Sequence, residues 1–194
     1  DVKGLMGRLI VLFPELNAVL SGTEEPAAAP RLTSWRSLKE RRQQLDKLIN
    51  EEIPANSRDI GVARSYGDLR ENFEYKSAKE QQGLLMRRRA ELEQDLAQAR
   101  GTDFRDVPLD RVGPGTQVRL RYPDGRVETY ALLGEWDQDA GLRIVSSSSR
   151  MAQLLNGARV GETVQLPDER ETMQPCTVEA IEAPSDAVRE WMRG

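Results

Sequence analysis

The chain has 194 residues, with 28 lysines and arginines against 32 aspartates and glutamates, a formal net charge of −4, no histidine and one cysteine. These counts exclude Ser-His-Asp and Cys-His catalysis, zinc sites made of histidine or of four cysteines, and an internal disulfide. The charge is too balanced for a general nucleic-acid coat. Any chemistry must therefore use carboxylates, amines, hydroxyls or a metal shared with another molecule, and a reducing cytoplasm is the expected location.

Residues 1–32 combine an apolar segment with a linker. The apolar run Leu9–Phe13 is flanked by Arg8 and Pro14, and it is shorter than the roughly 20 apolar residues that span a bilayer. We expect no membrane association, and the charge beside the run argues against a signal peptide. A buried or partner-binding amphipathic helix is the better interpretation, followed by a flexible linker at residues 21–30. The chain begins with Asp1, as a fragment or a processed protein would.

Residues 33–100 are predicted to form an antiparallel coiled-coil hairpin. Apolar residues at spacings of three, four and seven mark the first arm: Trp35, Leu38, Leu45, Leu48 and Ile49. Apolar residues mainly at intervals of seven mark the second arm: Ala78, Leu85, Leu92, Leu96 and Ala99. Such repeats bury a narrow seam between two helices. Arms of about 25 residues would extend roughly 40 Å, and the connection around residues 54–67 would form the tip of a thin rod.

Residues 101–194 are predicted to form a small α+β domain in which an antiparallel sheet curls over one short helix. The candidate strands are Gln117–Tyr122, Arg126–Leu133, Leu142–Ser146, Thr163–Leu166 and Cys176–Ile181. The turn residues Pro123-Asp124-Gly125 predict a hairpin between the first two strands. The short helix is expected at Met151–Leu155. Residues 101–194 contain no phosphate-binding or dinucleotide-binding motif, which favours a docking or folding module.

The densest polar cluster lies at the predicted tip, where Asp68 and Glu71 are three residues apart. On a helix they would face the same way and could hold one hard cation. The same spacing also fits a capping box with Asp68 as N-cap, which the spacing alone favours. Two carboxylates are too few ligands for a stable Mg²⁺ site. A metal held here would need ligands from a partner, which points away from a free-standing enzyme.

Two segments carry a resemblance to a known family. The run from Ala63 to Tyr75, ARSYGDLRENFEY, followed by AKEQQ at residues 78–82, is similar to the signature of the bacterial Gre transcript cleavage factors. Leu69 and Glu74 bring it closer to GreA than to GreB. A second, weaker likeness covers residues 145–162, and the similarity extends over residues 33–182.

The resemblance implies a coiled coil that enters the secondary channel of RNA polymerase and an FKBP-like domain that docks on the polymerase. It implies that Asp68 and Glu71 act in the polymerase site, where they help to hold a Mg²⁺ ion shared with the polymerase during cleavage of backtracked RNA. Asn72, Glu74 and Tyr75 are the expected supporting residues of the tip. The chain would be a monomer without a tightly bound cofactor, would contact the nascent RNA 3′ end, and would not be an enzyme by itself.

Several alternatives stay open. Arg87, Arg88 and Arg89 could steer RNA toward the tip, although ordinary solvated helix faces explain most such side chains. Tyr75 could pack against the opposite arm. Rival functions are a channel regulator without cleavage, an FKBP-like chaperone or prolyl isomerase, and an inert coiled-coil adaptor. Phe73, Arg150 and Ala158 depart from the family pattern. Phe73 could alter the fit of the tip in the polymerase channel, and the other two concern the surface that docks on the polymerase.

The remaining candidate groups have structural interpretations. The hydroxyls of residues 146–149 are expected to serve as turn or cap groups, because no histidine is present to activate them. Cys176 is expected to be an inert, partly buried thiol.

Overall fold

The computed structural model describes residues 30–66, 72–168 and 170–194. In chain order, the described elements are β1 (Arg31–Ser34), α3 (Trp35–Lys47), η1 (Leu48–Glu52), α4 (Ile53–Arg64), α5 (Phe73–Gln98), β2 (Ala99–Thr102), β3 (Thr116–Arg121), β4 (Val127–Leu132), β5 (Ile144–Val145), α6 (Arg150–Leu155), β6 (Thr163–Pro167), β7 (Met173–Glu182) and α7 (Asp186–Arg193). The N-terminal segment interpreted as an amphipathic helix and linker lies outside the described residues, except for residues 30–32. No helix of the described residues is long and apolar enough to cross a membrane.

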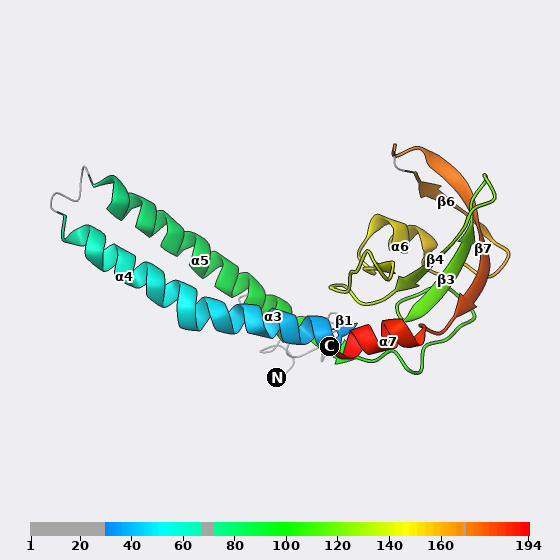
Figure 1. The fold of residues 1–194 in the computed structure, drawn as a ribbon, viewed down its shortest axis with the longest axis horizontal. Coiled ribbons are helices and arrows are strands. Elements are labelled where there is room, and N and C mark those ends of the chain that lie inside the picture. The colour runs from blue at the N-terminus through cyan, green and yellow to red at the C-terminus, as the bar shows by residue number, and fades with distance from the viewer. Residues whose placement is uncertain (1–29, 67–71, 169) are drawn as a thin grey trace, which may run out of the picture. The chain divides into compact units, whose positions relative to one another are not determined.

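The predicted helical hairpin is confirmed. One arm consists of α3, η1 and α4, and α5 runs beside it as the other arm (Figure 1). Leu48, Leu85 and Leu92 are buried in the seam between the arms, with Leu45 and Ile53 packed against them. The seven-residue spacing of Leu85 and Leu92 places both on the face of α5 that meets the first arm.

The connection between the arms begins later than expected. The sequence predicts the connection from Pro54 onward, but α4 continues through Pro54 to Arg64. A π-helical turn, η1, precedes the proline, and the Ile53 N–H bonds to the Leu48 carbonyl five residues back. Proline lacks an N–H and clashes with the carbonyl four residues earlier in a regular α-helix. The wider turn provides a way to accommodate Pro54 without ending the helix.

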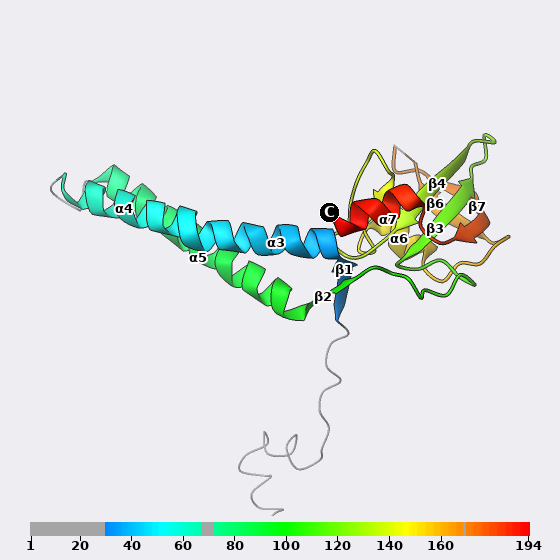
Figure 2. The same ribbon diagram turned by 60° about the horizontal axis from the view of Figure 1, so that its bottom comes forward.

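A short parallel sheet closes the hairpin at its base. β1 pairs with β2, with Arg31 opposite Ala99 and Ser34 opposite Thr102 (Figure 2). The sequence predicts that the second helix includes residues 99 and 100, whereas α5 ends at Gln98. Gly101 lies directly beneath the Trp35 ring, where a Cβ would come within 2.5 Å of a ring carbon. A glycine is therefore needed at this position for Trp35 to pack on the strand.

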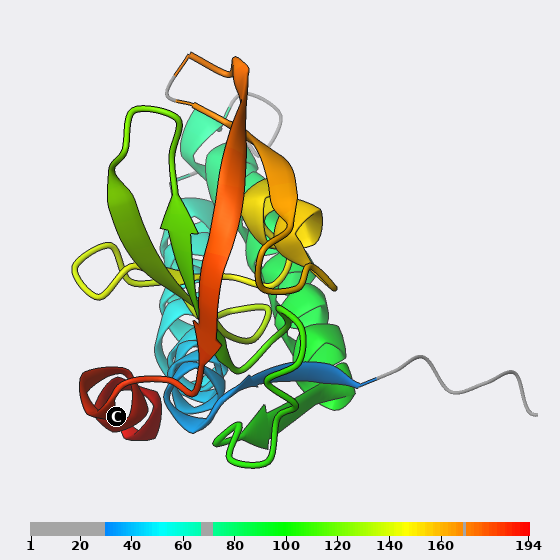
Figure 3. The same ribbon diagram turned by 90° about the vertical axis from the view of Figure 1, so that its right-hand side faces the viewer.

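The α+β fold of the second half is confirmed. Its five strands lie in the order β5-β4-β3-β7-β6 (Figure 3). All neighbours are antiparallel except β4 and β5, which are parallel, so the sheet is mixed rather than purely antiparallel. Gly125 takes a positive φ of 85° in the predicted turn between β3 and β4. The candidate strand at residues 142–146 is reduced to Ile144–Val145.

The curled sheet encloses α6 on its concave side (Figure 1). Ala152 and Leu155 of α6 are buried with Val118, Leu120 and Val178 of the sheet in one core cluster. The same cluster contains Cys176, which is fully buried. Burial raises the pKa of its thiol, which keeps the group protonated at neutral pH and agrees with an inert thiol.

The C-terminal helix α7 was not predicted. Val188 and Met192 of α7 are buried in a second cluster with Ala131 and Leu133 of the sheet region. Leu132, between these two residues, belongs to the first cluster instead. Because successive strand residues face opposite sides, α6 and α7 contribute to the cores on opposite faces of the sheet.

A buried carboxylate connects the base of the hairpin to the sheet domain. Asp137, in the loop between β4 and β5, is fully buried. It accepts hydrogen bonds from the Ser34 hydroxyl at 2.6 Å, from the Ser34 N–H at 2.9 Å and from the Gly134 N–H at 2.8 Å. The Thr33 hydroxyl is also within 3.2 Å. These donors satisfy the charged group and fix the loop against the start of α3.

Candidate functional site at the hairpin tip

The tip is bounded by the C-terminus of α4 and the N-terminus of α5. Asp68 and Glu71, the predicted catalytic and metal-binding pair, lie outside the described residues. The first described residue after them is Asn72, which is the N-cap of α5. The N-cap of α5 is therefore Asn72 rather than Asp68, and the predicted Asp68–Glu71 capping box lies outside the described residues. The free-energy gain of a capping side chain comes from Asn72 instead.

Asn72 joins the two arms. Its Oδ1 accepts a hydrogen bond from the Tyr75 N–H at 2.9 Å, which caps α5. Its Nδ2 donates to the carbonyl of Ala63, in the last turn of α4, at 2.6 Å. One side chain thus ties the end of the first arm to the start of the second, directly next to Glu71 in the chain.

Aromatic and charged side chains surround this tie. The Arg64 guanidinium lies over the Tyr75 ring, 5.8 Å from its centre, so Tyr75 contacts the opposite arm as one of the two interpretations expected. Phe73 and Tyr66 are 79% and 65% exposed. Glu74, in the first turn of α5, is exposed as well. The free chain therefore presents two large apolar rings and a carboxylate beside the tip.

The arginines at residues 87–89 lie more than a dozen residues along α5 from the tip, about 20 Å away at 1.5 Å per residue. Arg89 pairs with Glu93 at 2.8 Å, and Arg88 lies 3.9 Å from Glu52 of the opposite arm. These ion pairs agree with the ordinary helix-face interpretation. Steering of RNA by this cluster stays a prediction.

The described residues contain no group of three or more histidine, cysteine, aspartate or glutamate side chains that could hold a metal ion. Asp68 and Glu71 supply carboxylate oxygens, which are the ligand type that Mg²⁺ prefers. Two ligand residues do not fill the coordination shell of the ion. The donor set thus fits a Mg²⁺ ion that has further ligands from elsewhere.

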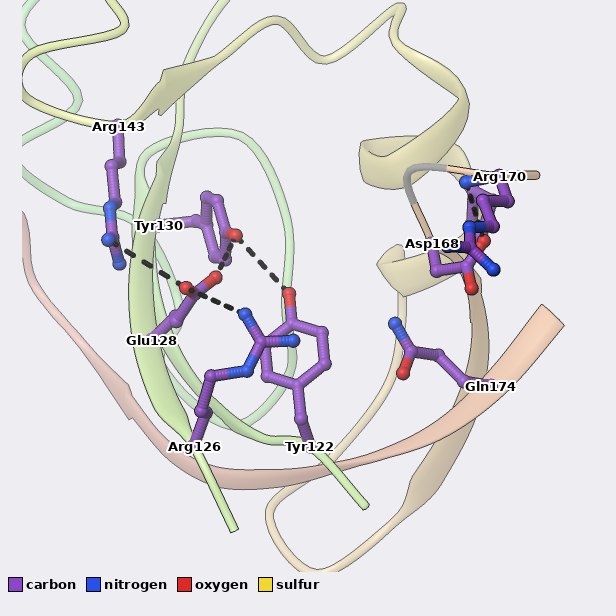
Figure 4. A pocket seen from close by; sticks show the side chains of 9 residues that line it. Tyr122, Arg126, Glu128, Tyr130, Arg143, Asp168, Arg170 and Gln174 are labelled. Carbon is purple, nitrogen blue, oxygen red and sulfur yellow. Dashed lines mark hydrogen bonds and ion pairs between the residues drawn. The ribbon is translucent and has the colours of Figure 1, made fainter. Parts of the chain in front are cut away.

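The sheet domain has its own cavity, of about 650 Å³, between the β3–β4 and β6–β7 hairpins (Figure 4). Its walls carry Tyr122, Tyr130, Glu128, Arg126 and Arg143. Pro167 is the one aliphatic side chain among the described residues that line it. Small-molecule sites are mostly lined by apolar and aromatic side chains, whereas charged and amide side chains make up most of this lining. The isomerase alternative stays a prediction.

The serine run has structural roles, as expected. Ser149 is the N-cap of α6, and its hydroxyl accepts from the Ala152 N–H at 3.2 Å. The Ser146 hydroxyl donates to the Glu135 carbonyl at 2.6 Å. Arg150, which departs from the family pattern, occupies the exposed first position of α6.

Comparisons with known proteins agree on one family. The family model "Transcription elongation factor, N-terminal" matches residues 32–100, and "Transcription elongation factor, GreA/GreB, C-term" matches residues 107–183. The GreA of Treponema pallidum (strain Nichols) is 36% identical over 128 residues, covering 66% of this chain and 79% of that protein. The chain belongs to the GreA/GreB family of transcription elongation factors.

Other GreA relatives are much longer than this chain. The GreA of Borreliella burgdorferi is 38% identical over 167 residues, which are 84% of this chain but 18% of that protein. The GreA of Chlamydia pneumoniae is 33% identical over 86% of this chain and 23% of its own length. The crystal structure of GreA factor homolog 1 (Gfh1) of Thermus thermophilus aligns with a TM-score of 0.36 at 19% identity, over 79% of this chain and 99% of that chain.

The GreA/GreB membership confirms the resemblance that the tip sequence indicated. The family models do not match two segments that complete the fold: residues 101–106, between the two matches, and residues 184–194, which contain α7. Sequence reasoning also missed the role of Asn72 as a tie between the arms. Its signal was present, because asparagine is a preferred N-cap residue.

Proposed function

We propose that this GreA/GreB-family chain binds RNA polymerase and stimulates the polymerase's own Mg²⁺-dependent cleavage of backtracked RNA. Asp68 and Glu71 are the proposed acting residues, delivered through the secondary channel by the helical hairpin. The observation that carries the proposal is the Asn72 tie, which joins α4 and α5 immediately beside this acidic pair. The proposed partners are the polymerase and the RNA 3′ end, and the chain is proposed to work as a monomer in the cytoplasm.

The hairpin suits the delivery of a small group into a narrow space. α5 has 26 residues, which corresponds to about 39 Å at 1.5 Å per residue. The buried leucine seam holds the two arms together along this length. Two packed helices form a stiffer support than a single chain, because bending one arm would open the seam.

Asp68 and Glu71 would hold the second Mg²⁺ ion together with ligands of the polymerase. Once bound, that ion would complete a two-metal site, in which one metal activates the attacking water and the other stabilises the leaving oxygen. The two carboxylates would raise the occupancy of that ion, since they would add to its ligand set. The Asn72 hydrogen bond to Ala63 and the Arg64–Tyr75 contact hold the described ends of the two arms together. The chain supplies position and charge, and the polymerase supplies the nuclease.

The test uses a stalled, backtracked elongation complex with labelled RNA and Mg²⁺. Adding the parent chain is expected to release short 3′ RNA fragments. Asp68→Asn and Glu71→Gln are expected to abolish the release while polymerase binding, measured separately, is retained. Glu80→Gln, on an exposed position of α5, is the matched control and should behave as the parent does.

Two outcomes would favour the rivals. If the chain binds polymerase and alters elongation without cleavage, it is a channel regulator. If neutralising Asp68 and Glu71 leaves both binding and cleavage unchanged, the acidic tip is dispensable and the proposed mechanism is wrong.

A further inference from the structure

The cavity of the sheet domain contains a hydrogen-bonded chain that ends on a carboxylate (Figure 4). The Tyr122 and Tyr130 hydroxyls are 3.2 Å apart, and the Tyr130 hydroxyl donates to Oε2 of Glu128. Since Tyr130 uses its proton on Glu128, Tyr122 must donate to Tyr130. Burial raises the pKa of both phenols, so both are protonated at neutral pH. The Tyr122 oxygen keeps its acceptor capacity toward the cavity.

Two guanidiniums face the other oxygen of the same carboxylate. Arg126 and Arg143 lie 3.7 and 3.8 Å from Oε1 of Glu128, whose side chain is 20% exposed. Direct guanidinium–carboxylate hydrogen bonds are about 2.7–2.9 Å long, so both contacts are loose. Each guanidinium also lies over a tyrosine ring, Arg126 over Tyr122 at 5.2 Å and Arg143 over Tyr130 at 5.8 Å. The pair is therefore held in place while its N–H groups are only weakly engaged by Glu128.

The other charged side chains near the cavity either interact with neighbouring residues or lie at the edge of the wall. Asp124 pairs with Arg126 from the turn. Asp168 accepts the N–H groups of Arg170 and Thr172 at 2.8 Å each, which fixes its own turn. The Arg170 side chain forms no ion pair with any described residue. Counting only described residues, Arg143 and Arg170 are the wall cations without a close carboxylate partner, and they lie on opposite walls of the cavity (Figure 4).

From this arrangement we infer that the cavity is a binding site for an acidic peptide segment of a partner protein, in which one ligand carboxylate bridges Arg126 and Arg143 in place of Glu128. The volume of about 650 Å³ lies within the range of sites that hold a small ligand. The amide of Gln174 and the Tyr122 oxygen add a donor and acceptors, which match the alternating N–H and C=O groups of a peptide main chain.

Nucleic acid fits the same wall less well. Both tyrosine rings contact a guanidinium and pack against the core cluster, so stacking a base on either ring would displace one of these contacts. Residues 101–194 carry 11 basic against 16 acidic side chains, which opposes attraction of a phosphate backbone. A peptide with one or two carboxylates is repelled less by this net negative charge than a phosphate backbone with many charges.

The inference does not depend on RNA polymerase and can be tested on the chain alone. The probe is an acetylated and amidated hexapeptide of alternating glutamate and serine, and its match carries glutamine at each glutamate. Binding is measured by titration calorimetry and by NMR shifts of the ¹⁵N-labelled chain. We expect the glutamate peptide to bind at least tenfold more tightly than the glutamine peptide, with shifts at residues 122–130 and 143.

Substitutions of single residues test whether the peptide binds at this cavity. Arg143→Gln should weaken binding at least fivefold, and Arg143→Lys should restore only part of it because lysine lacks the planar fork. Glu128→Gln should tighten binding threefold or more, since it removes the competing internal carboxylate. Arg121→Gln is the control, because Arg121 pairs with Glu179 and does not line the cavity. Thermal unfolding verifies that each variant is folded.

Three results would overturn the inference. Equal affinity for both peptides, or no affinity for either, excludes an acidic-peptide site. Tighter binding of inorganic phosphate, a single-stranded oligonucleotide or a proline-containing peptide assigns the cavity to that ligand class instead. An Arg143→Gln variant that is folded and binds the glutamate peptide as the parent does places the peptide elsewhere.

Discussion

Ser34 and Asp137 are joined by two donors of the same residue, the Ser34 hydroxyl at 2.6 Å and the Ser34 N–H at 2.9 Å from the Asp137 carboxylate. Ser34 is also the N-cap of α3, where its hydroxyl oxygen accepts from the Ser37 N–H at 3.2 Å. One serine therefore begins the hairpin and anchors it to the β4–β5 loop at the same time. The position of the hairpin base depends on a buried carboxylate of the sheet domain.

Asp137→Asn should destabilise the fold by about 2–4 kcal/mol, because an amide cannot accept all the hydrogen bonds that now reach the buried carboxylate. Urea unfolding followed by circular dichroism measures this change. Asp124→Asn, at an exposed turn, is the control and should change the free energy of unfolding far less than Asp137→Asn does. A value for Asp137→Asn that is as small as the control would show that the anchor contributes little.

Asn72→Ala should lower the stability of the hairpin by about 1 kcal/mol through loss of the N-cap, and should reduce RNA cleavage more than it reduces polymerase binding. Asn72→Asp keeps the cap acceptor for the Tyr75 N–H but loses the donor to the Ala63 carbonyl. If the hydrogen bond between the arms is needed for function, the Asn72→Asp variant should keep the helix stability of the parent. It should nevertheless stimulate RNA cleavage by the polymerase more slowly than the parent does. Parent-like cleavage by both variants would contradict this role.

Gly134→Ala should destabilise the protein by about 1–3 kcal/mol, because an added Cβ would lie 2.3 Å from the Leu32 carbonyl oxygen. Gly83→Ala provides the matched comparison within α5, where nothing lies within 4 Å of the added carbon. That change should instead stabilise the helix by about 0.5–1 kcal/mol. Thermal unfolding of the two variants should therefore shift in opposite directions.

Stability should fall in alkaline solution as the partly buried phenols of Tyr122 and Tyr130 ionise. Tyr122 and Tyr130 have pKa values above the ordinary value of 10.0, because burial disfavours the phenolate. Above pH 10 the unfolded chain loses these protons while the folded chain retains them, so the free energy of unfolding decreases as pH rises. Tyr130→Phe should flatten this decrease. Tyr66→Phe, at an exposed position, should follow the parent curve, and identical curves for all three proteins would refute the assignment.

The long-range pattern of the fold could be predicted from the sequence because it follows from apolar periodicity. Leu85 and Leu92 repeat at seven residues and are buried in the seam, and the Pro123-Asp124-Gly125 turn joins two alternating strands. The helix through Pro54 could not be predicted in this way. Proline usually ends a helix, and a π-helical turn that accommodates it has no simple sequence signal.

The missed elements divide into two kinds. The parallel pair β1–β2 joins residues 31 and 99, so it depends on closure of the whole hairpin rather than on either four-residue segment. α7 had a local signal, since Ser185 is an N-cap residue and Val188, Trp191 and Met192 are spaced for one helix face. At the site, the acidic pair was found from its sequence signature, whereas the Asn72 tie depends on the arms meeting in space.

The most direct test of the account is the Mg²⁺ dependence of RNA cleavage in a backtracked elongation complex. Initial cleavage rates are measured across Mg²⁺ concentrations with no added chain, with the parent and with the Asp68→Asn, Glu71→Gln double variant. The account predicts that the parent lowers the half-saturating Mg²⁺ concentration and that the double variant returns it to the value of polymerase alone. A double variant that lowers it as much as the parent would contradict the claim that these two carboxylates help to hold the ion.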